Sequence, residues 1–394
     1  MLGDRVISVN DSSIIGLEPK EVASLIKGEP NATVALAIRR NHESLEVKAK
    51  RSAITDDTMI DSYMLTDKLG YIKLKRFVDK SYIETKKALE SLKDQGMETL
   101  VFDLRGNPGG LMSVAEKIAD EFLTKNQLVV FTKDAQGKKK MFYATNDGSF
   151  DGKPIYVLID EESASASEII AGAIQDNDAG TIVGRRSFGK GLVQREISLG
   201  DGTKLRLTTA RYYTPSGRSI QKPYTNGSSE DYTKDLAKRY MRGEFFSLDS
   251  IHVPDSLKYK TVKGRTVYGG GGIIPDIFVP LDSMKYSVWY YTYKDRNHFN
   301  EKILDYIVDN KDKLSKIKEE HFIAFFNAKP LAETLISEII GPKISWKPEE
   351  EKYFESFIKA NIADYVYGRA ASQRVWATED KMLKTVITLE TEKE

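Results

Sequence analysis

Leu69-Gly-Tyr-Ile-Lys-Leu-Lys-Arg-Phe77 alternates apolar and polar residues, as a β-strand does when one of its faces is buried. Ser81 to Gly96 follows with apolar residues at helical intervals and a Ser-x-x-Glu capping box at its start. The uninterrupted run Thr99-Leu-Val-Phe-Asp103 is typical of a strand buried on both faces. Residues 69–103 therefore predict a β-α-β unit, which favours a parallel sheet covered by helices.

The same order of elements recurs downstream. We expect a helix, a buried strand, a helix and a short strand over residues 111–123, 154–160, 163–175 and 180–183. From Lys190 to Tyr213 the sequence alternates as two strands joined by Gly200-Asp-Gly202, a hairpin signal. The predicted fold class is α/β: a parallel-sheet core with helices and an added β region.

The two ends of the chain have a different character. The N-terminal segment predicts three strands and a short amphipathic helix, over residues 2–10, 33–39, 44–50 and 18–27. Residues 222–262 are polar and irregular and indicate an insertion, a strand is expected over 273–279, and a mainly helical region follows. We expect domains over 1–55, 60–284 and 285–394.

Bulk composition excludes several classes of function. The chain has 394 residues, and its 59 basic side chains nearly cancel its 58 acidic ones, so no global field draws it to nucleic acid or an anionic membrane. No apolar run approaches the ~18 residues that a membrane span needs, and the first residues lack the pattern of a signal peptide. Cysteine is absent, which excludes disulfides, Cys-ligated zinc and a Cys nucleophile.

Three segments carry residues that could do chemistry: 103–111, 163–168 and 187–194. The first two follow a buried strand and open a helix. Because the carboxyl ends of parallel strands meet at one edge of a sheet, where α/β proteins bind ligands, we expect these segments to lie close together.

Ser165 lies at the start of a predicted helix, where unpaired N–H groups and the helix dipole stabilise an oxyanion. The amide of Ala166 is a natural donor, and Gly109 or Gly110 could supply a second one because a backbone without Cβ comes close to a substrate. Taken alone, Ser165-Ala-Ser-Glu168 also fits an ordinary helix capping box, and the Asn107 to Gly110 segment an ordinary turn.

A serine nucleophile needs a base. None of the four histidines, His42, His252, His298 and His321, falls in the predicted α/β core. Lysine replaces histidine where desolvation leaves its amine neutral, and Lys190 lies between Gly189 and Gly191 and before two apolar residues. Gln194, four residues further along, lies on the same face of an extended strand and could orient the amine. A glycine-flanked surface lysine is the ordinary alternative.

Taken together, these segments resemble the signature of the C-terminal processing peptidases, the tail-specific Ser–Lys proteases of the S41 type. The resemblance runs from Leu2 to about Leu281 and includes Leu207-Thr-Thr-Ala-Arg-Tyr-Tyr-Thr-Pro-Ser-Gly-Arg-Ser-Ile-Gln221 and Tyr268-Gly-Gly-Gly-Gly-Ile-Ile-Pro-Asp276.

The resemblance implies a serine endopeptidase that cleaves proteins near their C-terminal tails through an acyl-enzyme. Ser165 is then the nucleophile, Lys190 its base and Gln194 an assisting residue. Ala166 and either Gly109 or Gly110 form the oxyanion hole. The resemblance implies neither a cofactor nor a metal. The partners that it implies are protein or peptide substrates with accessible C-terminal tails. Family members work in the cell envelope, so a periplasmic location is expected. Substrate-binding residues and oligomeric state stay open.

The N-terminal segment resembles the second half of a PDZ domain, with the helix of residues 18–27 present and the first half missing. A PDZ domain binds a peptide tail as an added strand between a sheet edge and this helix. An incomplete gene model or a fragment would explain both the missing half and the missing export signal.

Two other functions compete with the peptidase. One is a non-catalytic PDZ and protease-like scaffold that binds peptides. The other is nucleotide binding, because Gly184-Arg-Arg-Ser-Phe-Gly-Lys190 matches the start of a phosphate-binding loop. The match fails at Gly191, where Ser or Thr would hold magnesium, and strands rather than a helix are predicted after it.

Overall fold

The computed structural model divides the chain into two compact units. It describes residues 4–40, 43–52, 59–145, 148–223, 234–282, 295–340 and 346–393. Residues 58–282 and 380–394 form one unit, called the core unit here, and residues 1–57 and 283–379 form the other. The predicted helical region of residues 285–394 is thus shared between the units.

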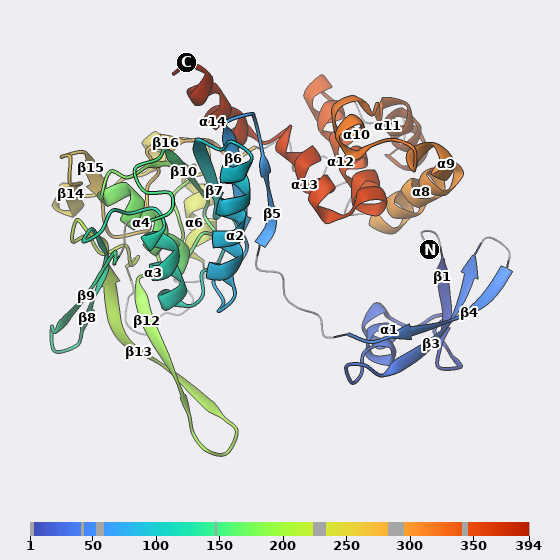
Figure 1. Ribbon diagram of the computed structural model, residues 1–394, viewed down its shortest axis with the longest axis horizontal. Coiled ribbons are helices and arrows are strands. Elements are labelled where there is room, and N and C mark those ends of the chain that lie inside the picture. Colours follow the sequence, from blue (N-terminus) through green and yellow to red (C-terminus); the bar gives the residue numbers. More distant parts are fainter. Residues whose placement is uncertain are drawn as a thin grey trace. The chain divides into compact units, whose positions relative to one another are not determined.

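A six-stranded sheet organises the core unit (Figure 1). Its strands, in spatial order, are β16 (Ile277–Phe278), β11 (Thr181–Gly184), β10 (Ile155–Ile159), β7 (Thr99–Asp103), β6 (Leu69–Leu74) and β5 (Met59–Met64). Neighbouring strands are parallel, except that the edge strand β5 runs antiparallel to β6. The predicted β-α-β unit and parallel sheet are confirmed.

Three helices cover one face of this sheet: α2 (Ser81–Asp94), α3 (Met112–Asp120) and α4 (Ala166–Asp176) (Figure 1). Alternate strand residues such as Ile72, Phe102 and Val157 are fully buried against them. The capping box predicted at Ser81 is wrong, because Lys80 is the N-cap and the Ser81 hydroxyl instead accepts the N–H of Val78 at 2.9 Å.

A single helix from the C-terminal end of the chain, α14 (Lys381–Thr391), covers the opposite face. Thr99 and Tyr156 point away from the α2–α4 side, and their hydroxyls donate to the Glu390 carboxylate at 2.8 and 2.7 Å. Met382, Leu383 and Val386 are buried. The strands are therefore buried on both faces, which explains the continuous apolar run in β7.

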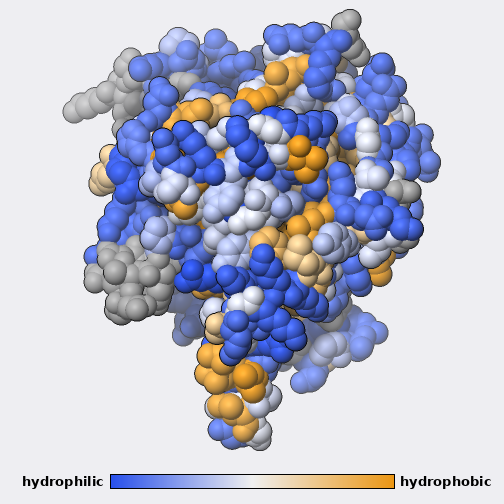
Figure 2. All heavy atoms as spheres, turned by 90° about the vertical axis from the view of Figure 1, so that its left-hand side faces the viewer, coloured by the Kyte–Doolittle hydropathy of each residue, from blue (hydrophilic) through white to orange (hydrophobic). Residues whose placement is uncertain are grey.

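A four-stranded antiparallel sheet adds the β region, in the order β12 (Leu192–Ser198), β13 (Lys204–Tyr213), β8 (Leu128–Asp134) and β9 (Lys139–Tyr143). The predicted hairpin is confirmed as β12–β13, whereas β8 and β9 were not predicted. Figure 2 shows apolar side chains gathered on the projecting hairpin at the bottom of the view; those exposed are Ile197, Leu199, Leu205 and Leu207.

The insertion of residues 222–262 is more regular than predicted, although residues 224–233 lie outside the described part. It contains α6 (Asp235–Met241), two 3₁₀ turns, η1 (Leu248–Ser250) and η2 (Asp255–Leu257), and strand β14 (Lys258–Lys260), which pairs with β15 (Thr266–Tyr268). Arg239 explains why so polar a helix is ordered: its guanidinium is buried and donates to the carbonyls of Ser187 and Arg186. The strand expected over 273–279 is reduced to β16.

The other unit contains a small β domain and a group of helices. In residues 4–52, strands β1 (Arg5–Val9), β2 (Ser12–Ser13), β3 (Thr33–Arg40) and β4 (Glu43–Lys50) form an antiparallel sheet in the order β2-β1-β3-β4, with helix α1 (Pro19–Ile26). All three predicted strands and the helix are present.

The helical part of this unit has a core of its own, which includes the fully buried Phe299, Phe322 and Phe354. Its helices are α8 (Arg296–Asp309), α9 (Lys311–Leu314), α10 (Glu319–Phe325), α11 (Lys329–Leu335), the π-helical turn η3 (Ile336–Ile340), α12 (Pro348–Tyr367) and α13 (Arg369–Ala377). Across the described ranges, no helix combines the length and apolarity needed to cross a bilayer.

The burial of α14 predicts how strongly it stabilises the core unit. Leu383 is 1% exposed, so Leu383→Ala should lower the free energy of unfolding by about 2–5 kcal/mol, as truncation of a buried leucine does. Lys384→Ala on the exposed side of the same helix should change it by less than about 0.5 kcal/mol. Urea unfolding measures both. Equal stability of the two variants would show that α14 does not cover the sheet.

Candidate active site

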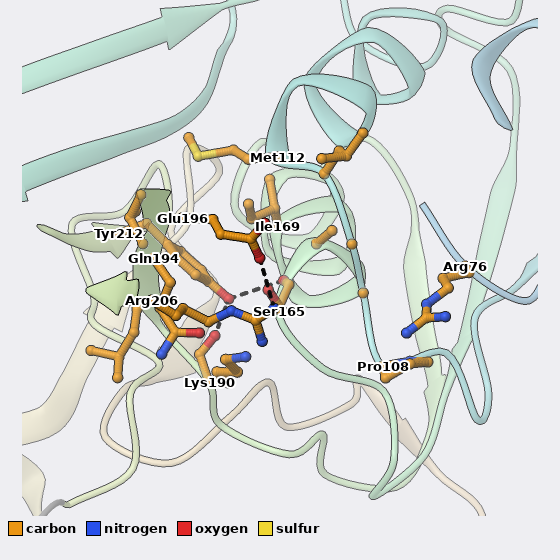
Figure 3. Close-up of a pocket in the computed structure, with 16 residues that line it drawn as sticks. Arg76, Pro108, Met112, Ser165, Ile169, Lys190, Gln194, Glu196, Arg206 and Tyr212 are labelled. Carbon is orange, nitrogen blue, oxygen red and sulfur yellow. Dashed lines mark hydrogen bonds and ion pairs between the residues drawn. The ribbon is translucent and has the colours of Figure 1, made fainter. Parts of the chain in front are cut away.

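A cavity of about 490 Å³ lies beside the carboxyl ends of the central strands. All six residues predicted from the sequence line it: Ser165, Lys190, Gln194, Gly109, Gly110 and Ala166 (Figure 3). They come from the segments that follow β7, β10 and β11, which are neighbours in the sheet. Parallel pairing therefore brings together residues that are far apart in the sequence, as expected.

Ser165 is the N-cap of α4, and the predicted capping box with Glu168 is present. The N–H of Ser165 donates to Glu168 Oε2 at 2.8 Å, and the N–H of Glu168 donates to the Ser165 carbonyl at 2.9 Å. Capping alone would account for a serine here. Two further features, its backbone conformation and its neighbours, set it apart.

The backbone of Ser165 is strained, with φ 57° and ψ −113°. Every other non-glycine residue with positive φ in the described ranges is Asn or Asp, the residue types that tolerate this region best. Holding a serine there costs about 1–3 kcal/mol, and such strain concentrates at functional sites. A sharp strand-to-helix turn exposes the side chain of the catalytic serine in α/β-hydrolases.

The flanking serines have structural roles. The hydroxyl of Ser163 donates to the Leu104 carbonyl at 2.8 Å, and that of Ser167 donates to the Asn107 carbonyl at 2.9 Å. Both serines are fully buried, whereas Ser165 is partly exposed to the cavity. The two hydrogen bonds fasten the start of α4 to the segment after β7.

A buried carboxylate, Glu168, joins the Ser165 segment to the Lys190 segment. Besides the N–H of Ser165, it accepts the N–H groups of Gly189 (2.7 Å) and Lys190 (2.9 Å) and the hydroxyl of Ser187. Burial raises the pKa of Glu168, and the four hydrogen bonds oppose that rise. The carboxylate thus depends on these donors to stay ionised, and the two segments depend on the carboxylate for their register.

Tyr212, from β13, makes a second link between the same segments. Its hydroxyl lies within hydrogen-bond distance of the carbonyls of Ser165 (2.9 Å) and Lys190 (Figure 3). Its ring is buried, with 2% of its surface exposed. The backbones of Ser165 and Lys190 are therefore fixed from two sides, by Glu168 and by Tyr212.

Gln194 lines the cavity, but for a different structural reason from the one predicted. Strand β12 begins at Leu192, so Lys190 precedes it, and the pairing of β12 with β13 shifts register between Val193 and Gln194. The prediction that Lys190 and Gln194 lie on one face of the same regular strand is therefore wrong. A bulge of this kind re-aims a side chain, and it leaves Gln194 lining the cavity.

The geometry distinguishes the two candidate glycines. The N–H of Gly109 already donates to Asn107 Oδ1 at 2.8 Å. Phe77 pairs with the residues on either side of Gly110, because its N–H donates to the Gly109 carbonyl and its carbonyl accepts the N–H of Leu111. Within the described part of the chain, the N–H of Gly110 donates to no other residue, and neither does that of Ala166.

A side chain at Gly110 would not fit, since a Cβ there would lie 2.0 Å from the Phe77 carbonyl oxygen. A Cβ at Gly109 would lie 2.7 Å from the Cβ of Ser165. The turn that contains Gly109 and Gly110, called the glycine turn here, is thus closely packed between Phe77 and the start of α4.

The sequence did not predict several residues in and behind the cavity wall. Glu168, buried behind the wall, was predicted only to cap a helix, and no role was predicted for Tyr212, which lines the cavity. Other cavity residues without a distinctive sequence signal are Arg76, Met112, Ile169, Glu196 and Arg206. In the described ranges, no three metal-ligating side chains converge to hold an ion.

Comparison with known proteins agrees with this arrangement. The model of peptidase family S41 matches residues 68–233, which include β6 to β13 and every residue discussed for the cavity. Residues 68–233 are thus similar to peptidase family S41. The S41 match contains both the strained serine and Lys190.

Individual relatives of the S41 region are processing proteases by name. The chain is 37% identical over 227 residues to a carboxy-terminal-processing protease of Bartonella bacilliformis, which covers 56% of this chain and 52% of that protein. It is 34% identical over 223 residues to the carboxy-terminal processing protease CtpB of Bacillus subtilis, covering 56% of this chain and 46% of that protein. The chain thus matches about half the length of these curated relatives.

The solved structure of a photosystem II D1 C-terminal processing protease is also similar. It shares 24% sequence identity, with a TM-score of 0.41, over 71% of this chain and 63% of that chain.

Glu168→Gln tests the link between the two segments of the S41 site. The amide NH₂ of glutamine would replace one of the two carboxylate oxygens, each of which accepts two donors, so two donors would lose their acceptor while the amide oxygen keeps the other two. We expect a loss of about 1–3 kcal/mol in unfolding free energy for each such buried donor. Thermal and urea unfolding measure it, with Glu162→Gln, an exposed carboxylate on the preceding turn, as the matched control. Equal stability of the two variants would contradict the role given to Glu168.

Proposed function

We propose that this chain is a serine endopeptidase in which Ser165 attacks the peptide carbonyl and Lys190 acts as its base. The observation that carries the proposal is the gathering of Ser165, Lys190 and Gln194 around one cavity, together with the Gly110 and Ala166 N–H groups, which have no acceptor among the described residues. The naming of its relatives as processing proteases agrees with it.

The proposed reaction begins with Ser165 Oγ. Lys190 Nζ takes the hydroxyl proton while Oγ bonds to the carbonyl carbon. Lys190 then gives the proton to the leaving amine, and an acyl-Ser165 remains. Water, activated by the same amine, releases the acyl group and restores both residues. Gln194 would orient the Lys190 amine between these steps.

The oxyanion of the tetrahedral intermediate needs two preorganised donors. We propose Gly110 and Ala166, which narrows the two glycines left open by the sequence to one. Gly110 is favoured because its N–H is uncommitted, whereas that of Gly109 is held by Asn107. The N–H of Ala166 lies at the positive end of α4, where a developing negative charge is stabilised.

The finer features of substrate delivery are also proposals. We propose that protein substrates are cut near their C-terminal tails, by analogy with the names of the relatives. Residues 1–55 would be the C-terminal half of a PDZ domain, which the antiparallel sheet and helix α1 support. We propose a protease core of residues 60–284 joined by the α14 segment, a helical region over the rest of residues 285–394, and a cell-envelope location.

Cleavage of an unstructured protein such as casein tests the Ser–Lys assignment. Ser165→Ala and Lys190→Ala should each lower the rate at least about a thousandfold, as loss of one member of a catalytic unit does. Lys190→Arg places a guanidinium there, which stays protonated and cannot act as a base, so it should be equally inactive.

Circular dichroism should show that all three variants remain folded. If a variant cleaves casein as fast as the wild type does, the residue substituted in that variant has no part in the mechanism. A folded wild type without activity would favour the non-catalytic scaffold.

A further inference from the structure

The first residue of the α14 segment, Asp380, has two bonding roles. Its Oδ1 caps α14 by accepting the N–H groups of Met382 (2.9 Å) and Leu383 (3.2 Å). Its Oδ2 accepts from Nη1 of Arg105 at 2.5 Å, across a sequence separation of 275 residues. One carboxylate therefore starts the helix and ties it to the segment after β7.

Arg105 is held from its other side by Asp103. Its Nε donates to Asp103 Oδ1 at 2.9 Å and its Nη2 to Oδ2 at 2.6 Å, a two-pronged ion pair. Asp103 also accepts the hydroxyl of Tyr71 at 2.7 Å. Burial favours a raised pKa for Asp103, but the charges of Arg105 and Lys73 outweigh it and hold the pKa well below its usual range. Arg105 is thus clamped between two carboxylates.

Arg105 is also the residue from which the glycine turn departs. The N–H of Gly106 donates to Asp160 at 3.0 Å, and Asn107 then fixes Gly109 and contacts the start of α4. Only four residues separate Arg105 from Gly110, so a displaced guanidinium would shift the backbone that aims the Gly110 N–H.

The first turn of α14 also touches the end of β11, the strand that precedes the lysine segment. A Cβ built on Gly184 would lie 3.1 Å from Cε of Met382, so Met382 packs against the residue where the chain leaves β11 toward Lys190. The other end of α14 contacts the opposite edge of the sheet, where Glu390 binds Thr99 and Tyr156 near the amino ends of β7 and β10.

We propose that Asp380 is a positioning residue of the active site, acting through Arg105 on the turn that carries Gly110. The docked helix α14 holds this turn in the shape that presents the Gly110 N–H to the oxyanion. This inference rests on the proposed peptidase function.

Asp380→Asn separates this role from helix capping. Asparagine caps a helix as well as aspartate does, but its amide nitrogen cannot accept from Arg105. Glu390→Gln is the matched control, because it weakens the docking of the same helix at the end remote from the turn.

We expect Asp380→Asn to lower kcat for peptide cleavage about 10- to 100-fold with KM unchanged within twofold, since small misplacements of catalytic groups cost this much. Glu390→Gln should change kcat less than twofold, although both variants lower Tm. Asp380→Glu should recover part of the lost kcat by restoring the carboxylate. A kcat that falls equally in Asp380→Asn and Glu390→Gln would overturn the proposal.

Amide hydrogen exchange provides a readout that does not need activity. Exchange across residues 105–111 should be faster in Asp380→Asn than in both wild type and Glu390→Gln. Equal exchange in the two variants would overturn the inference. If the wild type shows no Ser165-dependent cleavage, the proposed function is wrong, and the exchange comparison alone decides whether Asp380 positions the turn.

Discussion

The active site depends on one buried carboxylate. Glu168 accepts hydrogen bonds from Ser165, Gly189 and Lys190 through their backbones and from the Ser187 hydroxyl. These donors come from two segments that follow different strands, so the carboxylate fixes the start of α4 relative to the lysine segment. The strained backbone of Ser165 can persist because its own N–H is part of this set. A carboxylate without these donors would be too costly to bury, and the donors would be unsatisfied without it.

The parallel sheet explains how the segments around Glu168 come to lie next to one another. Strands β7, β10 and β11 are neighbours, and the glycine turn, the serine and the lysine each follow one of them. The helices α2, α3 and α4 bury one face of the sheet, and α14 buries the other. Since α14 also contacts Gly184 at the end of β11 and Arg105 after β7, the same helix that covers the sheet also contacts the segments that lead to the proposed active site.

Much of this could be predicted from the sequence because it is encoded locally. The apolar runs of β7 and β10 indicate strands buried on both faces, and a serine after such a strand indicates a helix start. The remainder depends on contacts between distant segments. The apolar run Leu128–Phe131 in β8 is only four residues long and does not by itself distinguish a strand from another buried segment, and β8 is ordered by pairing with β13, much later in the chain. The second role of Glu168, the availability of Gly110 and the docking of Asp380 also require neighbours that no local pattern reveals.

Trapping of the acyl-enzyme tests the central claim most directly. The chain would be mixed with a peptide thioester, quenched in acid and digested, and the digest analysed by mass spectrometry. The account predicts one acyl group per chain, attached to Ser165, with no adduct at that position in Lys190→Ala. Turnover of the thioester with the acyl group on another residue, or with no adduct on the peptide that carries Ser165, would contradict it.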